Sequence, residues 1–239
     1  MVSGGQLVLA VLAMGLGATV QGTVGFGQAL VATPLLLLID AQLVPGPATV
    51  AGAVLSVMVV IREGAETPVR GLRWAVAGLV PGTVLAGIAL AYLPTTGLAV
   101  LAASLIIAAV AASLVGLNIA PSPGALSTAG LLSGFMGTTA AISGPPIALV
   151  YQRVSGPALR ATLARFFVAA SLFTIIALVP AGKLGREEVL AGFVMVPGVL
   201  GGFALSGKLI GRFDRGLTRI AVLAVSGVSA LAVLARVLL

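Results

Sequence analysis

The stretch Gly22-Thr23-Val24-Gly25-Phe26-Gly27-Gln28 places three glycines within six positions, between two apolar runs. Each glycine costs a helix about 1 kcal/mol relative to alanine, so an unbroken helix through all three is unfavourable. Both flanks are apolar enough to lie in lipid, where a backbone break is tolerated only if protein or a polar cavity supplies partners for the freed N–H and C=O groups. We therefore predict a helix break inside the membrane, and this break is a candidate site.

A counterpart lies in the second half of the chain, in the stretch Gly134-Phe135-Met136-Gly137-Thr138-Thr139-Ala140-Ala141-Ile142-Ser143-Gly144-Pro145-Pro146. Gly17 and Gly27 have the same spacing as Gly134 and Gly144, at an offset of 117 residues, and the sequence Val-Pro-Gly recurs from 80–82 to 196–198 at an offset of 116. Two registers that agree within one residue indicate an internal duplication. We assign residues 1–117 to a first repeat and 118–239 to a second, within one integral membrane domain.

The composition identifies the class of protein. The chain is 59% hydrophobic and 8% charged, whereas soluble domains have about 25% charged residues, so an ordinary soluble domain is excluded. No alternating strand pattern is present, so we predict an all-α polytopic membrane protein. Cysteine and histidine are absent, which excludes disulfides, thiolate metal sites and Cys or His nucleophiles. We expect no cofactor and no enzymatic activity.

We expect ten helical segments, two of which are short and follow the breaks. They lie near 6–22, 28–39, 47–61, 72–92, 97–117, 125–141, a very short segment ending near 151, 157–179, 188–205 and 217–237. The polar segment from Arg62 to Arg73 is expected in water, and Asn118 to Gly124 is expected to connect the repeats. For Gly198 and Gly202, and for Gly207 and Gly211, the four-residue spacing favours helix packing.

The positive charge predicts the orientation rather than a nucleic-acid partner. Each broken pair returns to the side where it began, so each repeat crosses the membrane an odd number of times and the two repeats are inverted. One face then carries ten basic residues and the other three, which places the first face in the cytoplasm and both termini outside. The ten are Arg62, Arg70, Arg73, Arg153, Arg160, Arg165, Lys208, Arg212, Arg215 and Arg219; the three are Lys183, Arg186 and Arg236.

The breaks favour an anionic substrate. The short helices that follow them expose unpaired N–H groups and the positive ends of helix dipoles. Arg165 lies about 12 Å inside its predicted helix, where it either complements the anion or extends to the cytoplasmic interface; the sequence leaves both open. No acidic residue lies squarely inside a predicted helix, so we expect no dedicated proton carrier. The candidate binding residues are Gln21, Gly22, Gly25, Gly27, Gln28, Thr138, Thr139, Ser143, Gly144 and Arg165.

A glycine-rich break followed by proline, repeated in two halves of a helical chain, resembles the TauE/SafE-type sulfite and organosulfonate exporter family. The matching positions are Gly22, Gly25, Gly27 and Pro34 in the first motif and Gly134, Gly137 and Gly144 in the second. Gln28 and the sequence Ser143-Gly144-Pro145-Pro146 depart from the family pattern.

The resemblance implies a multi-pass transporter in the cytoplasmic membrane. Its expected substrate is a small sulfur-containing anion, such as sulfite, sulfoacetate or a related organosulfonate, and its expected direction is outward. An anion channel and an importer of another small anion stay open as alternatives. Assembly into a homodimer also stays open.

Overall fold

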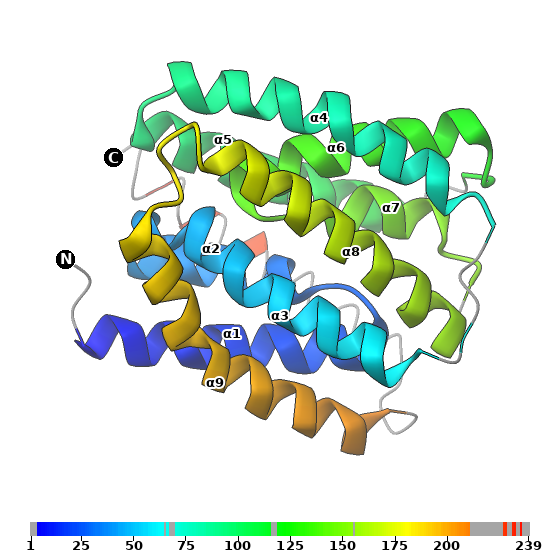
Figure 1. The fold of residues 1–239 in the computed structure, drawn as a ribbon, viewed down its shortest axis with the longest axis horizontal. Coiled ribbons are helices and arrows are strands. Elements are labelled where there is room, and N and C mark those ends of the chain that lie inside the picture. Colours follow the sequence, from blue (N-terminus) through cyan, green and yellow to red (C-terminus); the bar gives the residue numbers. More distant parts are fainter. Residues whose placement is uncertain are drawn as a thin grey trace.

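The computed structural model describes residues 4–64, 66, 70–115, 119–154 and 156–210, with 227, 228, 231, 232 and 235 near the C-terminus, and every regular element in these ranges is helical. The predicted all-α fold is confirmed, and the predicted segments before residue 210 are found within a few residues of their expected ends (Figure 1). The elements are α1 (Gly4–Val24), α2 (Gln28–Ile39), the short 3-10 helix η1 (Ala41–Leu43), α3 (Gly46–Arg62), α4 (Leu72–Tyr92), α5 (Thr95–Val115), α6 (Pro123–Ala140), α7 (Gly144–Val150), α8 (Pro157–Leu178) and α9 (Arg186–Leu209). The predicted segment 217–237 lies almost entirely outside the described residues.

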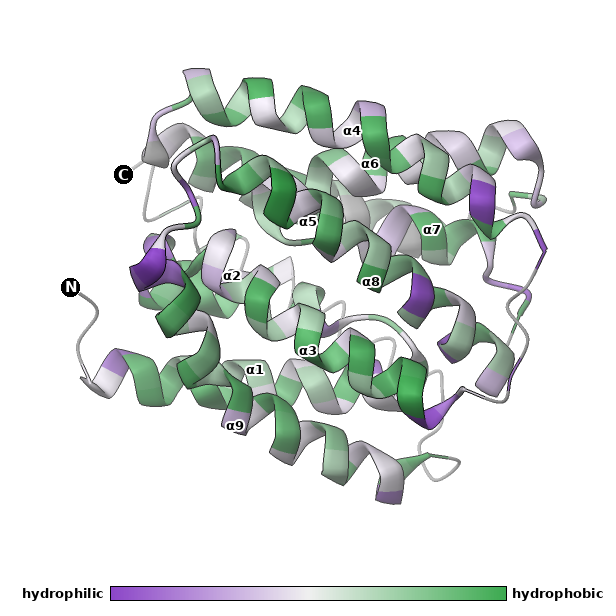
Figure 2. Cartoon of the chain, in the orientation of Figure 1, coloured by the Kyte–Doolittle hydropathy of each residue, from purple (hydrophilic) through white to green (hydrophobic). Residues whose placement is uncertain are grey.

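Four described helices, α1, α4, α8 and α9, are long and apolar enough to cross a membrane. They carry large apolar side chains that are more than half exposed, among them Leu12 on α1, Ile88 on α4, Ile176 on α8 and Phe193 on α9. Hydrophilic residues gather toward the two ends of the bundle, whereas the middle of the helices is largely hydrophobic (Figure 2). An outward apolar surface on helices of this length is typical of contact with lipid, so the chain is a membrane protein.

The helices α2 and α7 are too short to cross. Twelve residues extend roughly 18 Å and seven residues roughly 10 Å, whereas the hydrocarbon core is about 30 Å thick. Each short helix follows a sharp reversal, which is the predicted break. Gly25 and Gly27 adopt left-handed backbone conformations with φ of 106° and 108°. At the second break the left-handed residue is Ala141 rather than a glycine, with φ of 58°.

Two helix pairs pack most extensively, α1 with α9 and α4 with α6. Glycines make these close approaches possible, because a Cβ on Gly202 would collide with the Gly15 carbonyl oxygen and a Cβ on Gly82 with that of Leu131. The packing role expected for Gly198 and Gly202 is therefore confirmed. Gly207 has open space around it, and Gly211 lies outside the described residues.

The two closely packed pairs are counterparts in the predicted duplication, in which α1 corresponds to α6 and α4 to α9. Each pair joins a helix of the first repeat to a helix of the second, and the duplication would exchange one pair with the other. The inverted repeat itself stays a prediction. One end of the bundle, where α3 and α9 end and α4 and α8 begin, is called the arginine face below (Figure 1).

Candidate substrate cavity

Both helix breaks line one central cavity. Gly27 and Gln28 come from the first break, and Ser143 and Gly144 come from the second. The cavity has a volume of about 60 Å³, which is enough for a few water molecules or one small anion. The structure thus brings together two stretches that are more than a hundred residues apart in the sequence.

The polar lining of the central cavity is neutral. Hydroxyl and amide side chains come from α1, α2, α3, α8 and the residue before α7, and none of the described lining residues is charged. These polar residues are Gln21, Gln28, Thr33, Thr49, Ser56, Ser143, Ser171 and Thr174. Of these, Thr33, Thr49, Ser56, Ser171 and Thr174 were not among the sequence-predicted residues, because hydroxyls inside apolar helices give no signal of their own.

Gln28 is the lining residue with the clearest capacity to bind a ligand. Its residue exposure is only 6%, yet its Nε2 contacts the Met14 sulfur, a weak acceptor, at 3.9 Å. By contrast, the hydroxyl of Thr49 donates to the carbonyl oxygen of Pro45, just before α3, at 2.8 Å, and that of Ser56 donates to the carbonyl oxygen of Gly52 at 2.9 Å. The amide of Gln28 therefore keeps donors available to a molecule in the cavity.

Five of the ten sequence-predicted residues line the central cavity: Gln21, Gly27, Gln28, Ser143 and Gly144. Thr138 lies behind the cavity lining, where its hydroxyl is hydrogen-bonded at 3.1 Å to the hydroxyl of the lining residue Thr174. Thr139, Gly22 and Gly25 lie elsewhere: Thr139 lines a second cavity, and the two glycines contact arginines below the first break.

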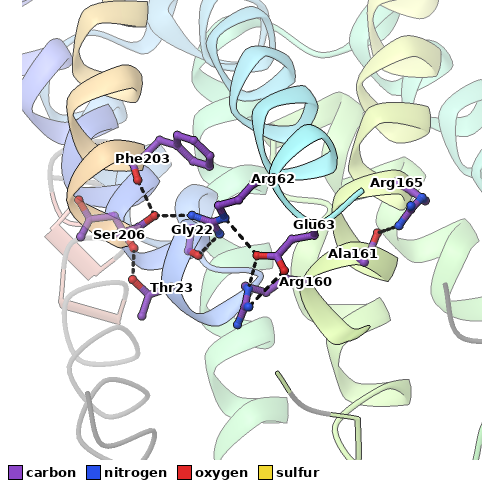
Figure 3. A network of polar contacts seen from close by, with 10 residues as sticks. Gly22, Thr23, Arg62, Glu63, Arg160, Ala161, Arg165, Phe203 and Ser206 are labelled. Atoms are coloured by element: carbon purple, nitrogen blue, oxygen red, sulfur yellow. Dashed lines mark hydrogen bonds and ion pairs between the residues drawn. The ribbon is translucent and has the colours of Figure 1, made fainter. Parts of the chain in front are cut away.

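Arg165 is placed away from the central cavity. Its side chain is partly exposed, and its guanidinium donates to the carbonyl oxygens of Ala161 at 3.2 Å and Gly64 at 3.3 Å. Figure 3 shows it turned away from the other labelled arginines. Of the two alternatives left open by the sequence, this position matches extension toward the membrane surface.

Arg160, one and a half turns earlier on α8, points inward instead. It binds Glu63 through two contacts, Nε to Oε1 at 2.7 Å and Nη2 to Oε2 at 3.2 Å, and both side chains are more than 90% buried. Arg62 adds a contact from its Nε to Glu63 Oε1 at 3.1 Å. These three residues form the arginine cluster, which the sequence did not predict (Figure 3).

The arginine cluster corrects one expectation. The segment from Arg62 to Arg73 was expected in water, but Glu63 at its start is only 7% exposed. Burial on its own raises the pKa of Glu63, but the hydrogen bond and charge of Arg160, and then those of Arg62, outweigh it and hold the pKa below its ordinary value. Glu63 is therefore an anion at neutral pH. The sequence places these residues at helix ends but gives no signal that residues 97 positions apart pair.

A second cavity of about 280 Å³ lies on the opposite side from the arginine cluster, at the end of the bundle that carries Lys183 and Glu187. Thr139 on α6 lines it, and the neighbouring residues Gly137 and Ala141 line the central cavity. The central cavity therefore lies between a wide cavity on one side and a buried ionic cluster on the other.

A bundle of membrane helices in which two broken pairs meet at a small polar cavity has the architecture of a membrane transporter. The family model for Sulfite exporter TauE/SafE matches residues 9–233, so the chain belongs to this family. Its members are transporters of the sulfite-exporter type and not enzymes. No curated protein and no solved structure matches this chain. Neither the structure nor these comparisons supports the homodimer that the sequence left open.

Proposed function

We propose that this protein exports a small sulfur-containing anion, such as sulfite, sulfoacetate or a related organosulfonate, and that the central cavity is its substrate site. The observation that carries the proposal is the convergence of both helix breaks on one cavity. In secondary transporters, substrates bind where the discontinuous helices of two repeats meet. The family supplies the chemical class of the substrate.

Dipoles and neutral donors would hold the anion. The first turn of α2, residues Gln28 to Leu30, lines the cavity, and a helix N-terminus favours negative charge. The amides of Gln21 and Gln28 add side-chain donors. Because the site has no fixed cation among its described residues, the bound anion forms no ion pair there. Release of the anion therefore breaks only hydrogen bonds and dipole contacts. At about 60 Å³, the cavity in this conformation suits sulfite better than sulfoacetate.

The arginine face lies in the cytoplasm in this proposal, and both termini lie outside. Its support is the excess of basic residues on that face, which the positive-inside rule associates with the cytoplasmic side. The second cavity, beside Lys183, then opens to the outside of the cytoplasmic membrane and provides the exit route.

Flux measurements in proteoliposomes test the proposal. Purified protein should move sulfite at a rate that saturates with concentration, whereas an anion channel conducts without such saturation. A thermal-shift screen across sulfite, sulfoacetate, taurine, thiosulfate and sulfate identifies the preferred anion, because a ligand stabilises the protein by RT ln(1 + [L]/Kd). Non-saturating flux would favour a channel, and absence of both flux and stabilisation for all five would contradict the proposal.

A further inference from the structure

Arg62 and Arg160 bind the carboxylate of Glu63 next to the first helix break, on the side of the arginine face. Arg160 grips both oxygens of Glu63, at 2.7 and 3.2 Å, and Arg62 binds one of the same oxygens at 3.1 Å. A guanidinium presents parallel N–H donors that match the geometry of carboxylates and other oxyanions. The arrangement is therefore an oxyanion-binding site whose present ligand is a side chain of the protein itself.

The arginine cluster lies between the central cavity and the arginine face. On α3, Ser56 lines the cavity and Arg62 follows six residues later, roughly 9 Å along the helix. On α8, Phe167 lines the cavity and Arg160 precedes it by seven residues, roughly 10 Å. Gly25 packs against Arg160, because a Cβ there would lie 3.1 Å from Arg160 Cγ. The cluster thus adjoins the break that lines the cavity.

Arg62 has partners that do not depend on Glu63. Its Nη1 donates to the Ser206 hydroxyl at 2.9 Å, its Nη2 donates to the Gly22 carbonyl, and its guanidinium lies 4.6 Å from the centre of the Phe203 ring. These contacts come from α1 and α9 and fix the guanidinium in place (Figure 3). Glu63, in contrast, is the residue just after α3, at the start of the connection to α4.

We propose that Arg62 and Arg160 form a second anion-binding station on the route between the central cavity and the arginine face, and that Glu63 occupies it when no anion is present. An entering anion displaces the carboxylate, and the return of Glu63 closes the route behind it. The cluster carries two positive charges and one negative charge, so it selects anions before they reach the neutral cavity. This inference rests on the proposed function in taking the substrate as the displacing anion.

The decisive variant is Glu63→Gln, which removes the competing charge and keeps the shape of the side chain. Thermal unfolding in detergent is followed while sodium sulfite is titrated at constant ionic strength. The sulfite concentration for half-maximal stabilisation should fall at least tenfold in Glu63→Gln, and the gain should disappear in the double variant Glu63→Gln, Arg160→Gln. The control is Glu66→Gln, which removes the same charge from an exposed position three residues away and should respond as the wild type does.

Each outcome separates this station from the proposed function. One outcome is that sulfite stabilises the wild type and Glu63→Gln with the same half-maximal concentration. That result refutes the station and leaves the proposed function standing. If sulfite stabilises Glu63→Gln and not the wild type, anion binding by the two arginines is supported, but sulfite as substrate and as the anion that displaces Glu63 is contradicted. If Glu63→Gln does not yield folded protein, Glu63→Asp is used, because its shorter carboxylate competes less well for the two arginines. A half-maximal sulfite concentration lower than in the wild type supports the station. An unchanged concentration refutes it.

Discussion

Gln28 is the residue on which we expect anion binding in the central cavity to depend most, because its amide is buried there and its Nε2 contacts the Met14 sulfur, a weak acceptor. Hydrogen bonds to charged groups contribute about 1.5–3 kcal/mol, so we expect Gln28→Leu to raise the Kd for sulfite roughly 10- to 100-fold. Sulfite titration by thermal shift measures this. Gln152→Leu, the same change at an exposed position, is the control; equal Kd values in both variants would remove Gln28 from the site.

Arg165 gives a second prediction at the scale of single residues. Its guanidinium lies outside the central cavity and contacts only backbone oxygens in the described structure. An exposed charge contributes about 0–1 kcal/mol, so Arg165→Gln should change the Kd for sulfite by less than about fivefold. The same titration measures it. A loss much larger than this would mean that Arg165 reaches the anion in another conformation.

The choice between Arg160 and Arg165 shows what the sequence could not resolve. The two residues are five positions apart on α8, which places them about 140° apart around the helix. Both sides of this helix are apolar, so periodicity does not indicate which arginine points inward. The partner of Arg160 settles it, and Glu63 is distant in the sequence. Ion pairs of this kind are set by tertiary packing, which local patterns do not report.

Helices and their breaks were predictable because their signals are local. Apolar runs bounded by glycine, proline and charged residues gave the limits of α2 and α4 as the structure has them. The glycines at 25 and 27 marked the first break correctly. At the second break the left-handed residue is Ala141, which no propensity favours. Five of the cavity's hydroxyl residues, on α2, α3 and α8, were also missed, since their place in the lining depends on how these three helices face one another.

Two neighbouring glycines of α9 test the helix packing. A Cβ on Gly202 would meet the Gly15 carbonyl oxygen and the Ala18 side chain on α1, whereas Gly201 has nothing within 4 Å. Overpacking of a close contact costs about 1–3 kcal/mol, so Gly202→Ala should be destabilising by this amount. Gly201→Ala should be neutral or slightly stabilising, because alanine favours helix. Unfolding midpoints in detergent compare the two, and equal midpoints would show that α1 and α9 are not packed as described.

In the part of the chain that the structure describes, a neutral central cavity lies next to the buried cluster of Arg62, Glu63 and Arg160. Together with the lack of histidine and of charged residues in the described cavity lining, this favours transport driven by the membrane potential rather than by a dedicated proton carrier. An anion that leaves a negative-inside cell gains about 2.3 kcal/mol per charge per 100 mV, which supports roughly a 50-fold gradient. A doubly charged anion gains twice as much.

Liposomes with an imposed potential and equal pH on both sides test this energetic prediction. We expect sulfite to move in the direction that the potential dictates, with a flux that carries net charge. The control is the same preparation at zero potential with a pH gradient or a sodium gradient. Flux that needs either gradient and ignores the potential would mean that a coupling site exists outside the residues considered for the cavity.

The central claim is that the two helix breaks form one anion site, and an experimental structure with a bound anion tests it most directly. Selenite is a heavier analogue of sulfite, and the anomalous scattering of selenium locates it in a crystal independently of any assumed site. We predict a selenium peak between Gln28 of the first break and Ser143 of the second, within hydrogen-bonding distance of both side chains. A peak in the cavity that contacts only one of the breaks, or the lack of any peak in the central cavity of a protein that transports sulfite, would contradict the account.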